Sequence, residues 1–121
     1  MDNFDYEILN RQIVKCYSRI EKPVWTEKEY ILFFRCFFKH YERYRGRQHY
    51  RLSNDNLFNI MCELPFEYKS SDGGCDLFSE DYTQKNGLIE RYFKTRFAAG
   101  CDYSIFHFMS VRGYRLYELY R

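Results

Sequence analysis

The sequence predicts a mainly α fold of the α+β class: a compact bundle of four to five helices with a short C-terminal strand or hairpin, compatible with a winged-helix-like arrangement. Apolar residues recur at helical spacing through most of the chain. Residues that typically begin or end helices flank these apolar segments. The length of 121 residues fits one domain, 1–121, with one core.

Two helices are predicted in the N-terminal part. The first runs from Asp2 to Glu21, where apolar residues follow the 3.6-residue period until Lys22-Pro23 ends it. The second begins at Thr26-Glu27-Lys28-Glu29, which has the spacing of a capping box, and Gly46 is placed to end it in a left-handed conformation. Its inward stripe consists of Tyr30, Phe33, Phe34, Phe37, Phe38, Tyr41 and Tyr44.

A third, shorter helix follows a stretch that we expect to be extended, Tyr50-Arg51-Leu52. Ser53 or Asn54 would cap this helix, and Pro65 would end it. Its apolar stripe is Leu57, Ile60, Met61 and Leu64. A polar loop is expected from Ser70 to Gly74.

The C-terminal part contains a predicted fourth helix, which starts near Ser79 or Thr83 and ends at Gly100. A last short helix would be capped by Asp102, although the same stretch could form a strand. We favour the helix because the apolar spacings of one, three and four fit it better than alternation does. Residues 114–120 are expected to form a strand. The inward residues of the two helices are Leu88, Ile89, Tyr92, Phe93, Phe97, Ile105, Phe106, Phe108 and Met109.

Composition points to an intracellular protein with free thiols. The five cysteines are an odd number at wide spacing, and no secretory signal peptide or membrane-spanning run is present in the sequence. We therefore expect a location in the reducing cytoplasm and no membrane partner. The 13 tyrosines carry hydroxyls that need partners, so some of these rings should reach the surface.

No catalytic residues, cofactor or metal site are predicted. Cys36 and His40 are one helical turn apart, but this spacing is more typical of a packed thiol beside a half-exposed imidazole than of a zinc site. A spatial dyad of Cys101 and His107 remains open as the enzyme alternative. We expect a protein that binds rather than catalyses.

Two charged surfaces are candidate binding sites, although the net charge is only +2. Basic residues interleave with Tyr41, Tyr44 and Tyr50, which suits phosphates and stacked bases, and the capped helix that follows resembles a helix-turn-helix or winged-helix reader. A solvated helix end explains the same cations equally well. The candidate residues are Lys39, Arg43, Tyr44, Arg45, Arg47, Tyr50, Arg51, Arg112 and Arg115.

The second surface is acidic and could imitate the phosphate track of a nucleic acid or dock into a basic groove of a protein partner. A plain solvated loop is the alternative, and composition favours it. The acidic residues are Glu63, Glu67, Asp72, Asp76, Glu80 and Asp81.

Three segments carry a resemblance to known proteins: IERYFKTRF at 89–97, CDYSIFHFMS at 101–110 and WTEKEY at 25–30. They resemble small uncharacterised proteins carried by mobile elements and phages of gut Firmicutes, which implies the cytoplasm of a bacterial host. Where that family has a Ser-Gly turn, this chain has Ser110-Val111. The resemblance implies a genomic setting and no site residues.

A mobile-element setting favours two functions. The first is a non-enzymatic inhibitor that binds a nucleic-acid-handling protein, such as an anti-CRISPR protein bound to a Cas effector. This likeness is one of size, setting and lack of catalytic motifs. The second is a winged-helix-like accessory or regulatory protein that binds DNA through the basic Arg and Tyr surface. The sequence leaves the oligomeric state open.

Overall fold

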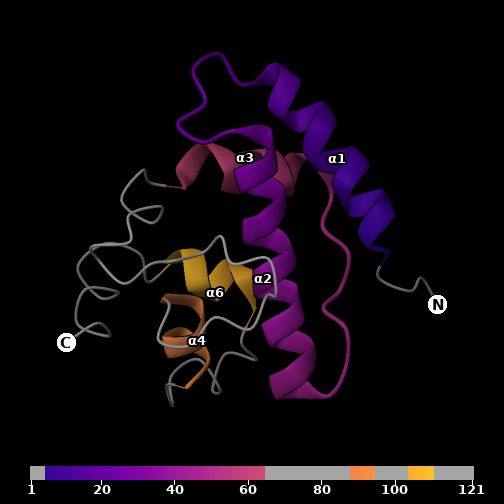
Figure 1. The fold of residues 1–121 in the computed structure, drawn as a ribbon, viewed down its shortest axis with the longest axis vertical. Coiled ribbons are helices and arrows are strands. Elements are labelled where there is room, and N and C mark those ends of the chain that lie inside the picture. Colours follow the sequence, from indigo (N-terminus) through magenta and orange to yellow (C-terminus); the bar gives the residue numbers. More distant parts are fainter. Residues whose placement is uncertain (1–4, 65–87, 95–103, 111–121) are drawn as a thin grey trace.

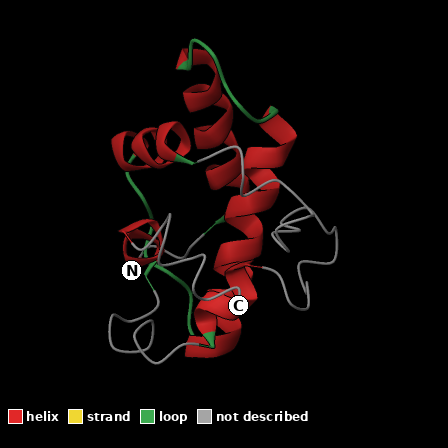
Figure 2. Cartoon of the chain, turned by 90° about the vertical axis from the view of Figure 1, so that its left-hand side faces the viewer, coloured by secondary structure: helices red, strands yellow, loops and turns green. Residues whose placement is uncertain are grey.

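The computed structural model describes residues 5–64, 88–94 and 104–110. In these ranges the chain forms α1 (Tyr6–Arg19), α2 (Glu27–Arg45), α3 (Asn54–Glu63), α4 (Leu88–Phe93) and α6 (Ile105–Ser110). The described ranges contain no strand, as Figure 2 shows. The prediction of a mainly helical fold is confirmed, whereas the strand predicted at 114–120 lies outside the described residues.

The long helix α2 forms the axis of the molecule (Figure 1). Helix α1 packs along one side of α2, and α4 packs on α2 near its C-terminal end. Helix α3 packs chiefly against α1 and crosses the end of the molecule where α2 begins. Helix α2 therefore has neighbours along most of its length, which explains why its apolar face is so broad.

The predicted ends of α2 are confirmed. The Thr26 hydroxyl accepts a hydrogen bond from the Glu29 backbone N–H at 3.2 Å, and the Glu29 carboxylate accepts one from the Thr26 N–H at 2.8 Å. These two bonds form a capping box, which satisfies backbone donors that the first turn leaves unpaired. At the other end, Gly46 has φ 69°, a left-handed conformation in which a side chain would be strained.

Helices α1 and α3 begin at side-chain caps. Asp5 caps α1, which ends at Arg19, so Glu21 lies beyond the helix that was predicted to include it. Ser53, the first of the two predicted alternatives, caps α3 by accepting from the Asn56 N–H at 3.1 Å. The stretch before α3 forms no strand in the structure.

The two C-terminal helices differ from their predicted bounds. Helix α4 ends at Phe93 and is followed by a turn at Lys94, so the single helix predicted to reach Gly100 stops earlier. Its predicted start, the loop at 70–74 and Phe97 lie outside the described residues. The helix predicted after position 102 is confirmed as α6, but its cap is Ser104, whose hydroxyl accepts from the His107 N–H at 3.2 Å. A cap at Asp102 was wrong because the helix starts two residues later.

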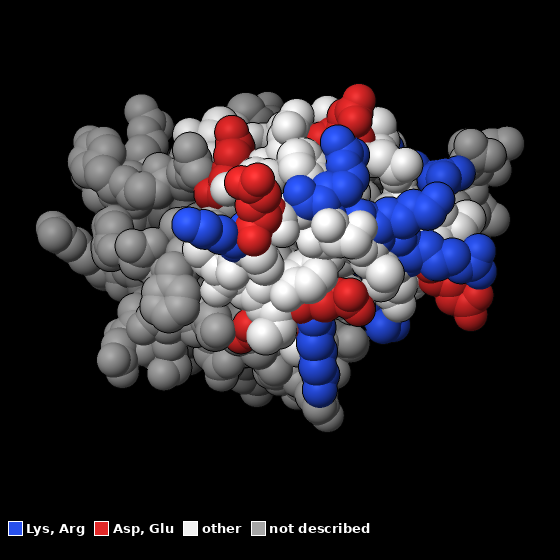
Figure 3. Space-filling model, turned by 90° about the horizontal axis from the view of Figure 1, so that it is seen from above, with Lys and Arg blue, Asp and Glu red and all other residues white. Residues whose placement is uncertain are grey.

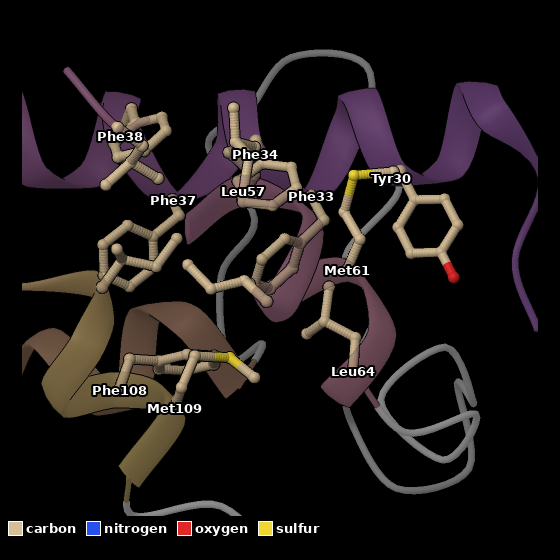
Figure 4. Close-up of a cluster of buried hydrophobic side chains, with 14 of the residues drawn as sticks. Tyr30, Phe33, Phe34, Phe37, Phe38, Leu57, Met61, Leu64, Phe108 and Met109 are labelled. Carbon is tan, nitrogen blue, oxygen red and sulfur yellow. The ribbon is translucent and has the colours of Figure 1, made fainter. Parts of the chain in front are cut away.

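The core combines aromatic rings, most of them from α2, with aliphatic and sulfur-containing side chains, and Figure 4 shows the part where α2, α3 and α6 meet. Phe37 is fully buried, and its ring centroid lies 5.0 Å from Phe93, 5.3 Å from Phe108 and 6.1 Å from Tyr92. These centroid distances lie in the range that favours aromatic pairs. Because α4 and α6 are short, they depend on these contacts with α2 for their positions.

Candidate binding surface

The predicted basic residues that reach solvent follow the end of α2 and the segment after it. Arg43 and Arg45 lie in the last turn of α2, and Arg47, Tyr50 and Arg51 lie in the connection to α3. All five are exposed. We call this set the cationic edge. Cations in the last turn of a helix also stabilise it, because they face the negative end of its dipole.

The connection from α2 to α3 is not a short turn. Residues 47–53 run back beside α2 toward the end of the molecule where α3 lies (Figure 1). The Gln12 side-chain amide anchors this segment to α1 by donating to the Leu52 carbonyl at 3.0 Å and to the Asn54 side-chain oxygen at 2.9 Å. The cationic edge is therefore elongated along the molecule.

This route removes the expected likeness to a helix-turn-helix. In that motif the second helix follows the first after a short turn and is presented as a recognition helix. Here α3 lies at the opposite end of α2 from Gly46 and packs on α1. The helix that follows the basic residues in the chain is thus not presented after a short turn as a recognition helix, and the strands of a winged-helix-like fold do not occur among the described residues.

Lys39 belongs to a contact between α1 and α2. Its ammonium lies 4.6 Å from the Tyr6 ring centroid, and the Arg35 guanidinium lies 5.6 Å from the same ring. The Tyr6 hydroxyl donates a hydrogen bond to the Glu42 carboxylate. Burial and this bond to Glu42 raise the pKa of Tyr6. Lys39 is half-buried and has a structural role here, unlike the exposed residues of the edge.

The three tyrosines of the candidate surface have different environments. Tyr41 is buried, so the expectation that it stacks on a ligand is wrong; its place on the inward stripe of α2 is confirmed. Tyr44 stacks on Phe93 with a centroid distance of 5.4 Å and an interplanar angle of 25°. Tyr50 is 52% exposed and has the most accessible ring of the three.

His49, which the sequence did not single out, holds the cationic edge against the core. Its ring is 2% exposed and lies 4.6 Å from the Tyr41 ring centroid and 4.2 Å from that of Tyr50. Nδ1 lies 2.8 Å from the Tyr50 carbonyl, and Nε2 accepts from the Ile105 N–H at 3.3 Å. Nδ1 must therefore carry the proton and donate it to the carbonyl, which makes His49 a neutral imidazole.

A second basic surface lies on α1. Figure 3 shows Lys and Arg side chains gathered on the side where Figure 1 places α1, with Asp and Glu side chains around them. Arg11 pairs with Glu7 at 3.8 Å, and the Arg19 guanidinium lies 4.6 Å from the Phe58 ring centroid. We call the exposed residues Arg11, Lys15, Arg19 and Lys22 the α1 cationic face. The spacing of four places Arg11, Lys15 and Arg19 on one side of α1, and Lys22 lies in the segment after the helix.

The remaining candidate residues are mostly outside the described ranges. This applies to Arg112 and Arg115 of the basic set. Of the acidic set, only Glu63 is described, and it is exposed at the end of α3. The others are Glu67, Asp72, Asp76, Glu80 and Asp81.

The Cys36 and His40 pair is packed in the core. The thiol sulfur lies 3.7 Å from His40 Nδ1, which is also 2.8 Å from the Cys36 carbonyl. Both side chains are buried, so the expected half-exposed imidazole is wrong. His107 Nδ1 lies 2.9 Å from the Tyr92 hydroxyl, whereas Cys101 is outside the described residues. No three His, Cys, Asp or Glu side chains in the described ranges come together as a metal site requires.

Comparisons with known proteins identify no relative. No protein-family model matches the chain, and searches of curated protein sequences and of solved structures find no similar protein. No helix in the described ranges has the length and apolar character needed to cross a membrane.

Proposed function

We propose that the protein acts by stoichiometric binding to a nucleic-acid-handling protein, through the cationic edge. The form of this function that the sequence resemblance favours is an anti-CRISPR inhibitor bound to a Cas effector. The observation that carries the proposal is the combination of four arginines with one half-exposed tyrosine on a single elongated surface.

Arginine and tyrosine are the residues that contribute most often to binding energy in protein interfaces. The arginine fork makes paired hydrogen bonds with carboxylates and phosphates, and the tyrosine ring removes a large area from water at a small entropic cost. In this protein the edge is also held in place, because His49 links the Tyr50 backbone to α6 and Gln12 links the Leu52 backbone to α1. A surface with a fixed backbone loses less entropy on binding than a mobile one.

Direct binding to DNA is the second candidate, and the exposed arginines themselves favour it. Phosphates are strong partners for arginine, and an elongated cationic track can follow a backbone without a recognition helix. Such binding would be weakly sequence-specific, since backbone phosphates carry no sequence information directly.

Co-elution in size-exclusion chromatography tests whether the protein binds a protein partner. We expect the purified protein to co-elute with a Cas effector in size-exclusion chromatography at near-equal amounts. A variant in which the four edge arginines are replaced by serine should elute alone. The matched control replaces the four residues of the α1 cationic face by serine and should still co-elute. Separate elution of the unmodified protein and the effector would contradict the proposal.

A titration with duplex DNA tests the second candidate. Each phosphate contact should lower log K by about 0.9 per decade of salt, so four contacts give a slope of about −3.6. The edge variant should lose this binding. Absence of binding at low salt would reject the DNA candidate and leave the protein partner.

A further inference from the structure

A groove between α3 and α6 has the features of a ligand site. It is lined from α3 by Asn56, Asn59, Ile60 and Glu63, and from α6 by Phe106, Met109 and Ser110. Its volume is about 510 Å³, which lies within the range of roughly 300–1,000 Å³ found for ligand pockets. None of these residues belongs to the cationic edge.

One wall of the groove is an exposed aromatic ring. Phe106 is 38% exposed, so its predicted inward position was wrong, whereas most of the phenylalanines in the described ranges are buried. Its ring stacks with Tyr50, with a centroid distance of 6.3 Å and an interplanar angle of 18°. Tyr50 therefore supports the Phe106 ring from outside the groove, while Phe106 itself lines the groove.

Contacts of the buried His49 hold the Phe106 ring in position. His49 lies 4.2 Å from Tyr50, centroid to centroid, and its Nε2 accepts from the Ile105 N–H. Ile105 is the first residue of α6, so this bond sets the start of the helix that carries Phe106. The rings of His49, Tyr50 and Phe106 form a column from the core to the groove. Because these contacts already hold the Phe106 ring, little side-chain entropy is lost when a ligand stacks on it.

The opposite wall has hydrogen-bonding groups of the kind that recognise bases. The side-chain amides of Asn56 and Asn59 each offer donors and an acceptor, a combination that matches the edge of a nucleobase. Glu63 adds a carboxylate that accepts from exocyclic amino groups. Arg51 is exposed three residues before α3 begins, in a second hollow lined also by Ser53 and Asn54. Its guanidinium is a candidate partner for a phosphate of a strand whose base enters the groove.

We propose that the groove between α3 and α6 binds an unpaired base of a single-stranded nucleic acid, stacked on Phe106 and contacted at its edge by Asn59. Single-strand recognition typically combines an aromatic ring for the base, amides for its edge and a nearby cation for the phosphate. A base inside a duplex cannot enter the groove, because its faces are covered by its neighbours. This base-binding site is distinct from the surface that we propose for a protein partner. The groove and the cationic edge share Tyr50 and Arg51 as neighbouring residues, but the residues that line the groove are outside the edge.

The test is a fluorescence titration of the full chain with a short single-stranded DNA that contains 2-aminopurine. Stacking should quench the 2-aminopurine fluorescence. The Phe106→Leu variant should bind at least about five-fold more weakly, because base stacking on an aromatic ring contributes this much or more. Asn59→Asp, which replaces the amide donors by a carboxylate, should also weaken binding about five-fold or more. Val14→Ala is the matched control, since Val14 is similarly exposed but lies on α1.

Circular dichroism and urea denaturation should show that each variant is folded. A second strand of equal length has an abasic site in place of 2-aminopurine, and its affinity is measured by how well it displaces the fluorescent strand. This abasic strand should bind more weakly than the intact strand. Equal binding of the abasic strand, or unchanged affinity of Phe106→Leu, would overturn the proposal, and so would the absence of quenching at low salt. Failure here leaves co-elution with an effector unaffected, because Arg43, Arg45 and Arg47 do not line the groove.

Discussion

Replacement of His49 by leucine tests how the cationic edge is joined to the core. Leucine has a similar volume and is apolar, so the packing is largely retained while both hydrogen bonds of the imidazole are lost. The Tyr50 carbonyl and the Ile105 N–H then lose their partner on His49. The bond to the Ile105 N–H is buried, whereas Tyr50 is half-exposed, so one buried group is left unsatisfied. Such a group costs about 1–3 kcal/mol, and we expect a loss of this size in the free energy of unfolding, against the roughly 5–15 kcal/mol of a typical domain.

The matched control is His40→Leu. His40 is also buried, but its Nδ1 bonds to the Cys36 carbonyl, which already accepts the helical hydrogen bond one turn along α2. That carbonyl keeps a partner after the replacement, so we expect a cost below about 1 kcal/mol. Urea denaturation followed by the fluorescence of the buried Trp25 measures both variants. Equal losses for the two variants, or a smaller loss for His49→Leu, would refute the role assigned to His49.

Three further predictions concern titration, thiol reactivity and capping. The pKa of Tyr6 and that of Tyr30 are raised, mainly by burial, so their contribution to stability is present below about pH 10 and is lost as pH rises above it. The urea midpoint should therefore fall as the pH rises above about 10, and Tyr6→Phe should reduce this fall. Cys62 is exposed, whereas Cys16 is buried with a raised thiol pKa. Mass spectrometry after a short alkylation should therefore find Cys62 modified before Cys16, and preferential modification of Cys16 would contradict this. Thr26→Ala removes the capping-box hydroxyl and should cost about 1 kcal/mol, measured by thermal unfolding; an unchanged midpoint would argue against the cap.

Local signals in the sequence were sufficient for the elements that depend on local chemistry. Each end of α2 depends on residues within one turn of that end: Thr26 and Glu29 form the capping box, and Gly46 takes the left-handed conformation. Spacing alone therefore predicts both ends. The cap of α6 shows the limit of such signals. Asp102 and Ser104 are both good capping residues, so local chemistry does not decide between them. The helix capped by Ser104 buries Ile105 and Phe108 in the core.

The candidate surface could be predicted only in part, because its shape depends on contacts between distant residues. The exposure of Arg43 and Arg47 follows from their charge, whereas the route of the segment depends on the bond from Gln12 to the Leu52 carbonyl. His49 bonds to Ile105, 56 positions away, and no spacing rule connects them. The α1 cationic face was missed because its members are separated along the sequence, and three of them are brought to one side only by the helix.

The most direct test of the central claim is target-DNA cleavage by a Cas nuclease in the presence of the protein at a one-to-one ratio. Three proteins are compared: the unmodified chain, the variant without the four arginines of the cationic edge, and the variant without the α1 cationic face. We predict that the unmodified chain and the α1 variant stop cleavage and that the edge variant does not. Cleavage that proceeds unchanged at a large excess of the unmodified chain, or inhibition by the edge variant at the same ratio, would contradict the claim.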